Sequence, residues 1–201
     1  MRHMLFLNEN VMIKYIFSIA ISLILRPLQT WKELKEKQED GNESFLSNFI
    51  YPFIGVVTIA AFIGVLFTRK GIDFQIALKT AILVLLSVFG GFFLASYIIN
   101  EVWHSIFKRE REMSLCLRFV GYSSSLIFVL YIVLSLLPEF FFLRIFVLYT
   151  IYIVWEGAIP YMDVKESEQL KFVIISTIII IATPLALELA LGKFMPGLIP
   201  N

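Results

Sequence analysis

Residues 46–67 read LSNFIYPFIGVVTIAAFIGVLF, and no Asp, Glu, Lys or Arg interrupts them. A helix needs about 20 such residues to cross the hydrocarbon layer of a bilayer. A helix also satisfies its own backbone hydrogen bonds, which lipid cannot do. This stretch therefore predicts a membrane-spanning helix, and the fold depends on whether the rest of the chain repeats the pattern.

Four further runs are also mainly apolar, although the run over 140–156 is weaker because it contains Arg144. Their expected limits are 80–100, 119–137, 140–156 and 172–192. Across the whole chain 59% of the residues are hydrophobic and 16% are charged, whereas about a quarter of a soluble domain is charged. The sequence predicts an all-α integral membrane protein in which a bundle of five transmembrane helices forms one domain over residues 46–201.

The N-terminal region, residues 1–45, is expected to place short amphipathic or interfacial helices ahead of the bundle. Residues 15–25 are apolar but too short to cross the bilayer reliably, and Lys14 and Arg26 bracket them. That pattern suits a helix that lies on the membrane or dips into it. A cleaved signal peptide is the alternative, but the run ends in Arg26-Pro27 rather than at small residues.

A second short helix is expected over Pro27–Asp40. Leu28, Trp31 and Leu34 recur at a spacing of three, and charged residues cover the other face. Such a helix either rests on the membrane with Trp31 at the level of the lipid headgroups or is a solvated connecting helix. The sequence leaves both alternatives open.

The positive charges predict how the chain is oriented. With five spans, 12 of the 17 Lys and Arg residues fall on the side that holds the N-terminus. Because cytoplasmic loops carry the excess of Lys and Arg, we expect a cytoplasmic N-terminus and an extracytoplasmic C-terminus. A net charge of +1 without a basic cluster argues against a nucleic-acid partner.

Ionisable residues inside the spans are candidate functional groups, since their burial is costly unless they are paired or hydrated. Glu188 follows Pro184 by one turn in the last span, and Glu156 ends the fourth. A Glu188 that faces the bundle could pair with a cation or relay a proton, whereas one at the outer interface would snorkel near Lys193. The sequence holds no metal-binding cluster, phosphate-binding loop or nucleophile–base set, so we expect neither catalysis nor a cofactor.

Pairs of small residues one turn apart predict close helix packing. The pairs are Ala60 and Gly64, Gly91 and Ala95, and Gly121 and Ser125. Small side chains let two helix backbones approach each other, either within one chain or between the copies of a homo-oligomer.

The order of these features resembles that of the Yip family, five-pass membrane proteins named for their interaction with Rab-type GTPases, and in particular its bacterial members. The likeness covers roughly residues 20–192 and rests on Pro27-x-x-x-Trp31, on Gly121-Tyr122, and on Tyr149-x-x-Tyr152-x-x-Trp155-Glu156-Gly157. Serines replace the proline that usually follows the family's glycine-tyrosine element. The resemblance implies five spans, a cytoplasmic N-terminus and, for this chain, the bacterial inner membrane.

Two functions from different classes are consistent with the sequence. The first is a non-catalytic membrane organiser or partner-binding scaffold, with the lipid bilayer and another membrane or cytoplasmic protein as partners. The second is a small oligomeric transporter or channel that uses Glu188. The candidate site residues are Trp31, Gly121, Tyr122, Glu156 and Glu188.

Overall fold

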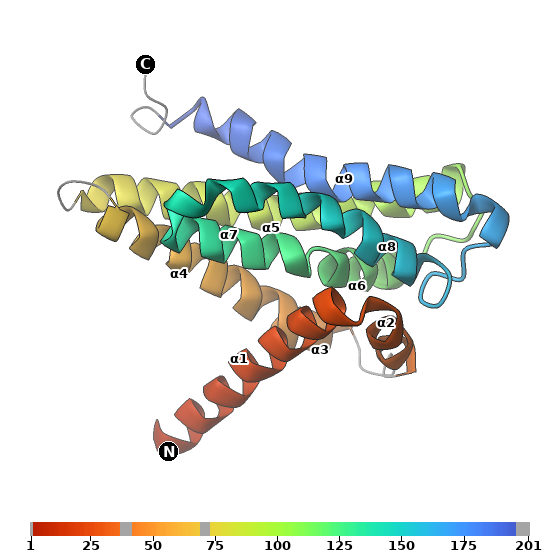
Figure 1. Cartoon of the computed structure of the whole chain (residues 1–201), viewed down its shortest axis with the longest axis horizontal. Helices are drawn as coiled ribbons and strands as arrows, with labels where there is room; N and C mark the ends of the chain where they lie inside the picture. Colours follow the sequence, from red (N-terminus) through yellow and green to blue (C-terminus); the bar gives the residue numbers. More distant parts are fainter. Residues whose placement is uncertain (1, 37–41, 69–72, 196–201) are drawn as a thin grey trace.

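The computed structural model describes residues 2–36, 42–68 and 73–195, and every regular element in these ranges is helical (Figure 1). In chain order the elements are α1 (Arg2–Leu25), α2 (Pro27–Glu36), α3 (Asn42–Phe45), η1 (Leu46–Ile50), α4 (Tyr51–Thr68), α5 (Phe74–Ser105), α6 (Met113–Ser123), α7 (Ser125–Leu136), η2 (Pro138–Tyr149), α8 (Thr150–Ala158) and α9 (Glu166–Gly192).

Five helical segments in the described ranges are long and apolar enough to cross a membrane. They are Glu43–Phe67, Phe74–Ser105, Met113–Leu136, Pro138–Ala158 and Glu166–Gly192. The expected all-α fold with five spans is confirmed. Each segment extends beyond its uncharged run, because a helix can continue into the headgroup layer with polar residues. α5, for example, begins where the Asp73 side chain accepts a hydrogen bond of 3.0 Å from the Ile76 N–H.

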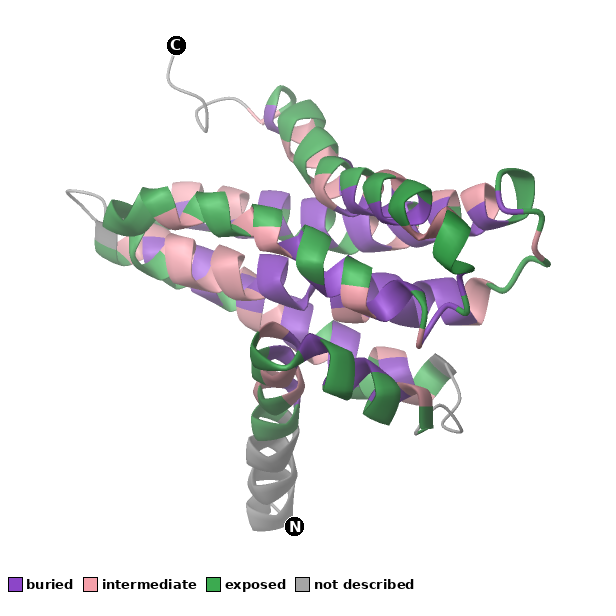
Figure 2. Cartoon of the chain, turned by 45° about the vertical axis from the view of Figure 1, so that its right-hand side comes forward, coloured by how far each residue is buried: buried purple, intermediate pink, exposed green. Residues whose placement is uncertain are grey.

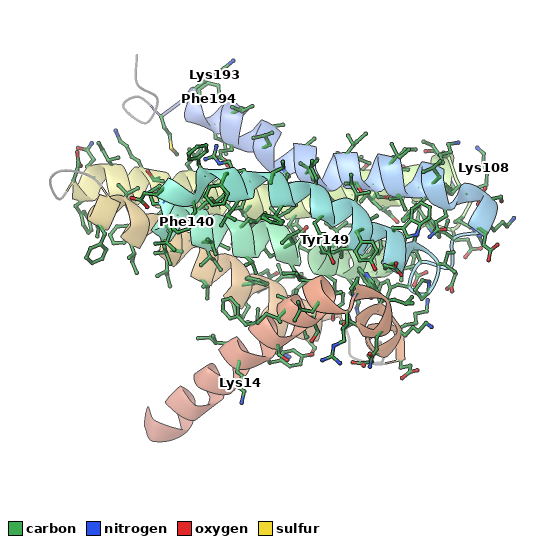
Figure 3. All side chains as sticks on the ribbon, in the orientation of Figure 1. Lys14, Lys108, Phe140, Tyr149, Lys193 and Phe194 are labelled. Atoms are coloured by element: carbon green, nitrogen blue, oxygen red, sulfur yellow. The ribbon has the colours of Figure 1, made fainter. Side chains whose placement is uncertain are left out.

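The long helices form an elongated bundle around α5. This helix packs against α4 and α9, and α4 packs in turn against α7. Only Leu137 separates α7 from η2, so the two form the expected tight hairpin. Lys108 marks one end of the bundle, and Phe140 and Lys193 mark the other (Figure 3). We call these the Lys108 end and the Lys193 end.

The outward faces of the bundle are apolar. Buried residues gather where helices meet, and exposed residues cover the outside (Figure 2). η2, a 3₁₀ helix, has no buried residue, and Phe141 and Ile145 on it are 69% and 67% exposed. A large exposed apolar surface of this kind is stable in contact with lipid chains.

Two features disturb regular helix within the spans. Ser124 separates α6 from α7, within a run of three buried serines, Ser123–Ser125. Pro184 lies inside α9, which continues past it to Gly192 although proline has no N–H to donate to the carbonyl one turn earlier.

The small-residue pairs lie at helix contacts within the chain. Gly64 meets the backbone of α7, Gly91 meets α9, and Gly121 lies beneath Phe45 of α3. The other members of the pairs, Ala60, Ala95 and Ser125, are buried as well. The predicted close packing is thus confirmed, and intrachain contacts occupy all three pairs.

α1 is longer than the short helix expected from the sequence, and it leads away from the bundle from its contact near α2 (Figure 1). Its second half, Ile13–Leu25, is mainly apolar: Ile16, Ala20 and Leu23 are buried, whereas Ile13, Tyr15, Ile21 and Leu25 are exposed together with the polar Lys14 and Ser18. Large apolar side chains outnumber polar ones on the exposed side, which would be mainly polar in a helix lying half in water. This half of α1 is therefore suited to lipid on one side and to the bundle on the other.

α2 also differs in detail from its prediction. Its buried face consists of Pro27, Thr30, Trp31 and Leu34. Leu28, expected on that face, is 44% exposed, because the helix turns about 100° per residue and the contact with the bundle is centred on Trp31. The expected end of this helix at Asp40 lies outside the described residues.

Candidate functional site

Trp31 anchors the N-terminal segment to the bundle. Its side chain is 0% exposed. The indole Nε1 donates a hydrogen bond of 2.9 Å to the Ile153 carbonyl of α8. The ring therefore packs inside the protein, in place of the contact with lipid headgroups that one of the two alternatives expected. Protein atoms, rather than lipid and water, surround the ring and satisfy its polar N–H.

Three aromatic rings surround the indole. Its centroid lies 5.3 Å from that of Phe119, in a stacked arrangement, 4.8 Å from Tyr161, and 6.0 Å from Tyr122, which presents its edge. We call these four residues the Trp31 cluster. Gly157 provides the remaining wall, because a Cβ there would lie 2.5 Å from the indole Cε2. Only glycine leaves room for the ring at this depth.

Gly121 and Tyr122 join the cluster to the start of the first span. A Cβ on Gly121 would lie 2.6 Å from Cζ of Phe45, so this glycine provides space for a neighbouring side chain. The Tyr122 ring lies 5.0 Å from Phe45 and 5.1 Å from Phe49. The structure thus brings the candidate residue Trp31 together with the adjacent candidates Gly121 and Tyr122, from which it is far apart in the sequence.

An ion pair borders the cluster. Lys35 Nζ lies 2.9 Å from Asp163 Oδ2 and also donates a hydrogen bond of 2.8 Å to the Tyr161 carbonyl. Asp163 has a positive φ of 53°, which turns the chain between α8 and α9. These contacts attach a second point of α2 to the same region of the bundle.

Sequence reasoning missed Phe119, Tyr161 and Arg118 in this region. Arg118, which directly precedes the third span as expected at 119–137, lies inside α6 and is 6% exposed. A charge within the apolar run Leu117-Arg118-Phe119 is a signal that could have identified it. Burial raises the pKa of the Tyr161 phenol, and Tyr122 adds to this rise, because the charged phenolate would lose its hydration.

A second candidate site surrounds Glu188. This residue is half-buried in α9, and its Oε2 accepts a hydrogen bond of 2.7 Å from the Tyr131 hydroxyl of α7. Glu188 therefore faces the bundle, and the alternative in which it snorkels towards water near Lys193 is not what the structure shows. Arg144 of η2 lines the same cavity, which has a volume of about 430 Å³. We call this cavity the Glu188 pocket.

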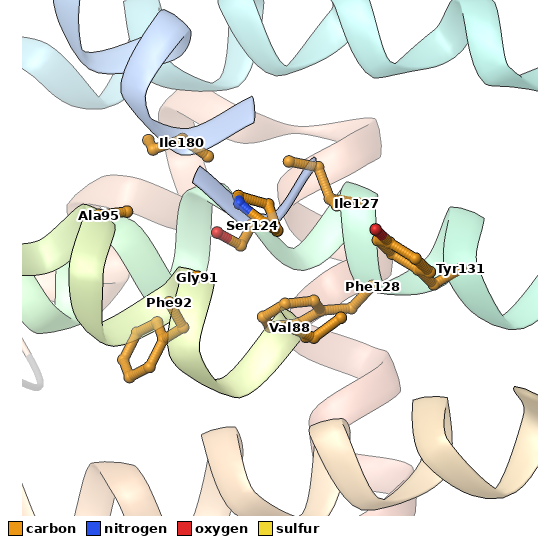
Figure 4. Close-up of a pocket in the computed structure, with 10 residues that line it drawn as sticks. Val88, Gly91, Phe92, Ala95, Ser124, Ile127, Phe128, Tyr131 and Ile180 are labelled. Atoms are coloured by element: carbon orange, nitrogen blue, oxygen red, sulfur yellow. The ribbon is translucent and has the colours of Figure 1, made fainter. Parts of the chain in front are cut away.

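The Glu188 pocket narrows towards the middle of the bundle. An adjoining cavity of about 10 Å³ shares Ile127, Tyr131 and Pro184 with it, and Figure 4 shows Ile127 and Tyr131 beside this space. A cavity of that size holds about one water molecule. Phe92 and Phe128, each 3% exposed, line the narrow part.

Glu156 lies apart from this pocket. It borders an outward-facing apolar hollow on η2 and α8, together with Tyr152 and Trp155. α9 begins at Glu166, shortly after the end of α8, and Glu188 lies about 33 Å farther along α9, at 1.5 Å per residue. Glu188 is therefore at the opposite end of the bundle from Glu156. Among the described residues, no group of three His, Cys, Asp or Glu side chains is placed to hold a metal ion.

Comparison with known proteins assigns a family. A family model described as the Yip1 domain matches residues 21–187, from α1 into α9, and this range includes the whole Trp31 cluster. No curated protein and no solved structure matches the chain. Because the match covers well over half of the chain and the helices are those of a multi-pass membrane protein, this protein is an integral membrane protein of the Yip1 domain family.

Proposed function

We propose that the protein is a non-catalytic membrane organiser in which α1 and α2 form a fixed wedge beside the five-span bundle. The observation that carries this proposal is the burial of Trp31, whose ring and N–H are both held by the bundle. A loosely tethered helix can follow the shape of a membrane. A helix held at a fixed position can instead impose shape on it.

The chemistry of α1 and α2 supports a wedge in one leaflet. α2 exposes Lys32, Glu33 and Glu36, so it lies at the water boundary. The apolar half of α1, Ile13–Leu25, meets α2 through the single residue Arg26. Its length is about 20 Å at 1.5 Å per residue, whereas the hydrocarbon layer is about 30 Å thick. It therefore adds volume mainly to the leaflet beside α2, which favours curvature.

The orientation and the membrane form part of the same proposal. The excess of Lys and Arg on the side of residues 1–45 supports a cytoplasmic N-terminus in a bacterial inner membrane. In that orientation the exposed charges of α2 face the cytoplasm and can bind another membrane or cytoplasmic protein. Fusion of alkaline phosphatase to the C-terminus tests the orientation, and we expect this fusion to be active. An inactive C-terminal fusion together with an active N-terminal fusion would show that the chain has the opposite orientation.

Reconstitution into vesicles tests the organiser function. Wild-type protein and the Trp155→Ala variant, at equal protein-to-lipid ratio, are expected to shift vesicle diameters to smaller values in electron cryomicroscopy. Trp31→Ala should lose this shift. Trp155 is a matched control because it is 39% exposed and lies outside the Trp31 cluster. Unchanged vesicles with the wild-type protein, or a full shift with Trp31→Ala, would reject the wedge.

A second candidate function is transport through the Glu188 pocket. It is favoured by the glutamate–tyrosine pair that faces a cavity inside the bundle. The narrowing to about 10 Å³ argues against an open path through one chain. Proton or solute flux into vesicles that depends on Glu188, but not on the exposed Glu139, would support transport over the organiser.

A further inference from the structure

The Glu188 pocket holds two opposite charges that do not neutralise each other. Glu188 and Arg144 both line the cavity of about 430 Å³. Among the described residues Arg144 forms no ion pair, and the hydrogen bond of Glu188 comes from Tyr131. Arg144 is exposed on its other side, and Glu188 is half-buried. Their separation across a cavity leaves one anionic and one cationic position for a ligand.

The pocket exists because α9 leaves the bundle after Pro184. At this residue α9 touches α5: a Cβ on Gly91 would lie 2.6 Å from the Pro184 Cα. From there to its C-terminus α9 diverges from α5 (Figures 1 and 2). The packing of helix backbones therefore sets the space between α5, α7, η2 and α9 that forms the pocket.

The walls of the pocket are mainly aliphatic. Leu130, Leu134, Val147, Ile181 and Leu185 line it, beside the polar groups of Tyr131, Arg144 and Glu188. The polar groups lie near the Lys193 end, where α7 ends and η2 begins. A ligand that fits this arrangement has a charged head near the membrane surface and an apolar chain that follows the helices inwards.

We infer that the Glu188 pocket binds a phospholipid whose headgroup carries both a phosphate and a primary ammonium, as phosphatidylethanolamine does. The Arg144 guanidinium matches the phosphate, since it presents several donors in one plane. The Glu188 carboxylate keeps lone pairs beyond the one used by Tyr131, and a primary ammonium can donate to them. A choline group has no N–H to donate, and a phosphatidylglycerol headgroup offers Glu188 no cation.

Native mass spectrometry of the whole protein in non-ionic detergent tests this inference. Phosphatidylethanolamine, phosphatidylcholine and phosphatidylglycerol with identical acyl chains are titrated against the wild-type protein. We expect phosphatidylethanolamine to bind at least about tenfold more tightly than either of the other two lipids. Free phosphoethanolamine is titrated separately, and it should bind at least tenfold more weakly, because it lacks the chain that the aliphatic walls contact.

Variants assign the binding to the pocket. Glu188→Gln should remove the preference among the three lipids, and Arg144→Gln should weaken the binding of all three, because all three carry the phosphate. Glu139→Gln should keep it, because Glu139 is exposed near the same end and does not line the pocket. Thermal unfolding without added lipid shows that each variant is folded. Equal binding of the three lipids, a preference that survives Glu188→Gln, unchanged binding in Arg144→Gln, or equally tight binding of free phosphoethanolamine would each overturn the inference.

Discussion

Replacing Trp31 with alanine is expected to release α2 from the bundle while the five long helices stay packed. The side chain is 0% exposed, and its Nε1 donates one hydrogen bond to the Ile153 carbonyl. An indole buries about 200 Å², which at about 25 cal/mol per Å² corresponds to about 5 kcal/mol. That value is an upper bound, because the released segment keeps part of this surface covered. Tryptophan-to-alanine changes in cores cost about 3–5 kcal/mol.

Hydrogen exchange of the α2 amides measures this release. α2 has 10 residues, and so short a helix is unstable once it is undocked. Since about 1.4 kcal/mol corresponds to a factor of ten, a loss of about 3 kcal/mol raises exchange over residues 27–36 at least 100-fold. Trp31→Phe, which keeps a ring but loses the N–H, should raise it about tenfold.

The pattern of exchange along the chain decides whether the reasoning holds. Trp155→Ala, at a half-exposed tryptophan on α8, should leave the α2 amides within about threefold of wild type. Unchanged α2 exchange in Trp31→Ala would refute the anchor. An equal rise in α2 and in α5 would also refute it, because it would mean that Trp31 stabilises the whole bundle rather than one docked segment.

Three further predictions concern the surroundings of Trp31. Gly157→Ala should raise α2 exchange although alanine favours a helix by about 1 kcal/mol, because its Cβ would overlap the indole. Asp163→Asn should change α2 exchange less than about fivefold, since the ion pair with Lys35 is largely exposed and asparagine tolerates the positive φ. Burial raises the pKa of Tyr161. Its neutral form therefore contributes stability below about pH 10, and this stability is lost as the pH rises further. Thermal unfolding between pH 8 and 11 should show the loss in the wild-type protein and less of it in Tyr161→Phe.

The five spans were predictable because lipid leaves the backbone few alternatives. Apolar runs marked all five, and the observed helices differ mainly by extensions beyond those runs, such as Met113–Arg118 ahead of the third. Those extensions were missed because a charged residue was taken as the end of a helix. Arg118 shows the error: it continues α6 and is buried.

The partners of the candidate residues could not be predicted in the same way. The sequence indicated an amphipathic α2, but an apolar face can cover either lipid or protein, and periodicity does not distinguish them. Trp31 meets Ile153 across 122 positions of the chain, and Glu188 meets Tyr131 across 57. Such contacts depend on which helices become neighbours. The sequence did indicate that Glu188 was a candidate, because a carboxylate inside a span needs a partner.

Distances between spin labels on α1 and on the bundle test the central claim, that Trp31 holds the N-terminal helices at a fixed position. Exposed Ser18 of α1 and exposed Ile174 of α9 are replaced with cysteine and labelled, in a Cys116→Ala background and in lipid nanodiscs. The account predicts one narrow distance distribution with Trp31 present, also in Trp155→Ala, and a broad one in Trp31→Ala. A broad distribution with Trp31 in place would contradict it, since α1 would then be a loose tether.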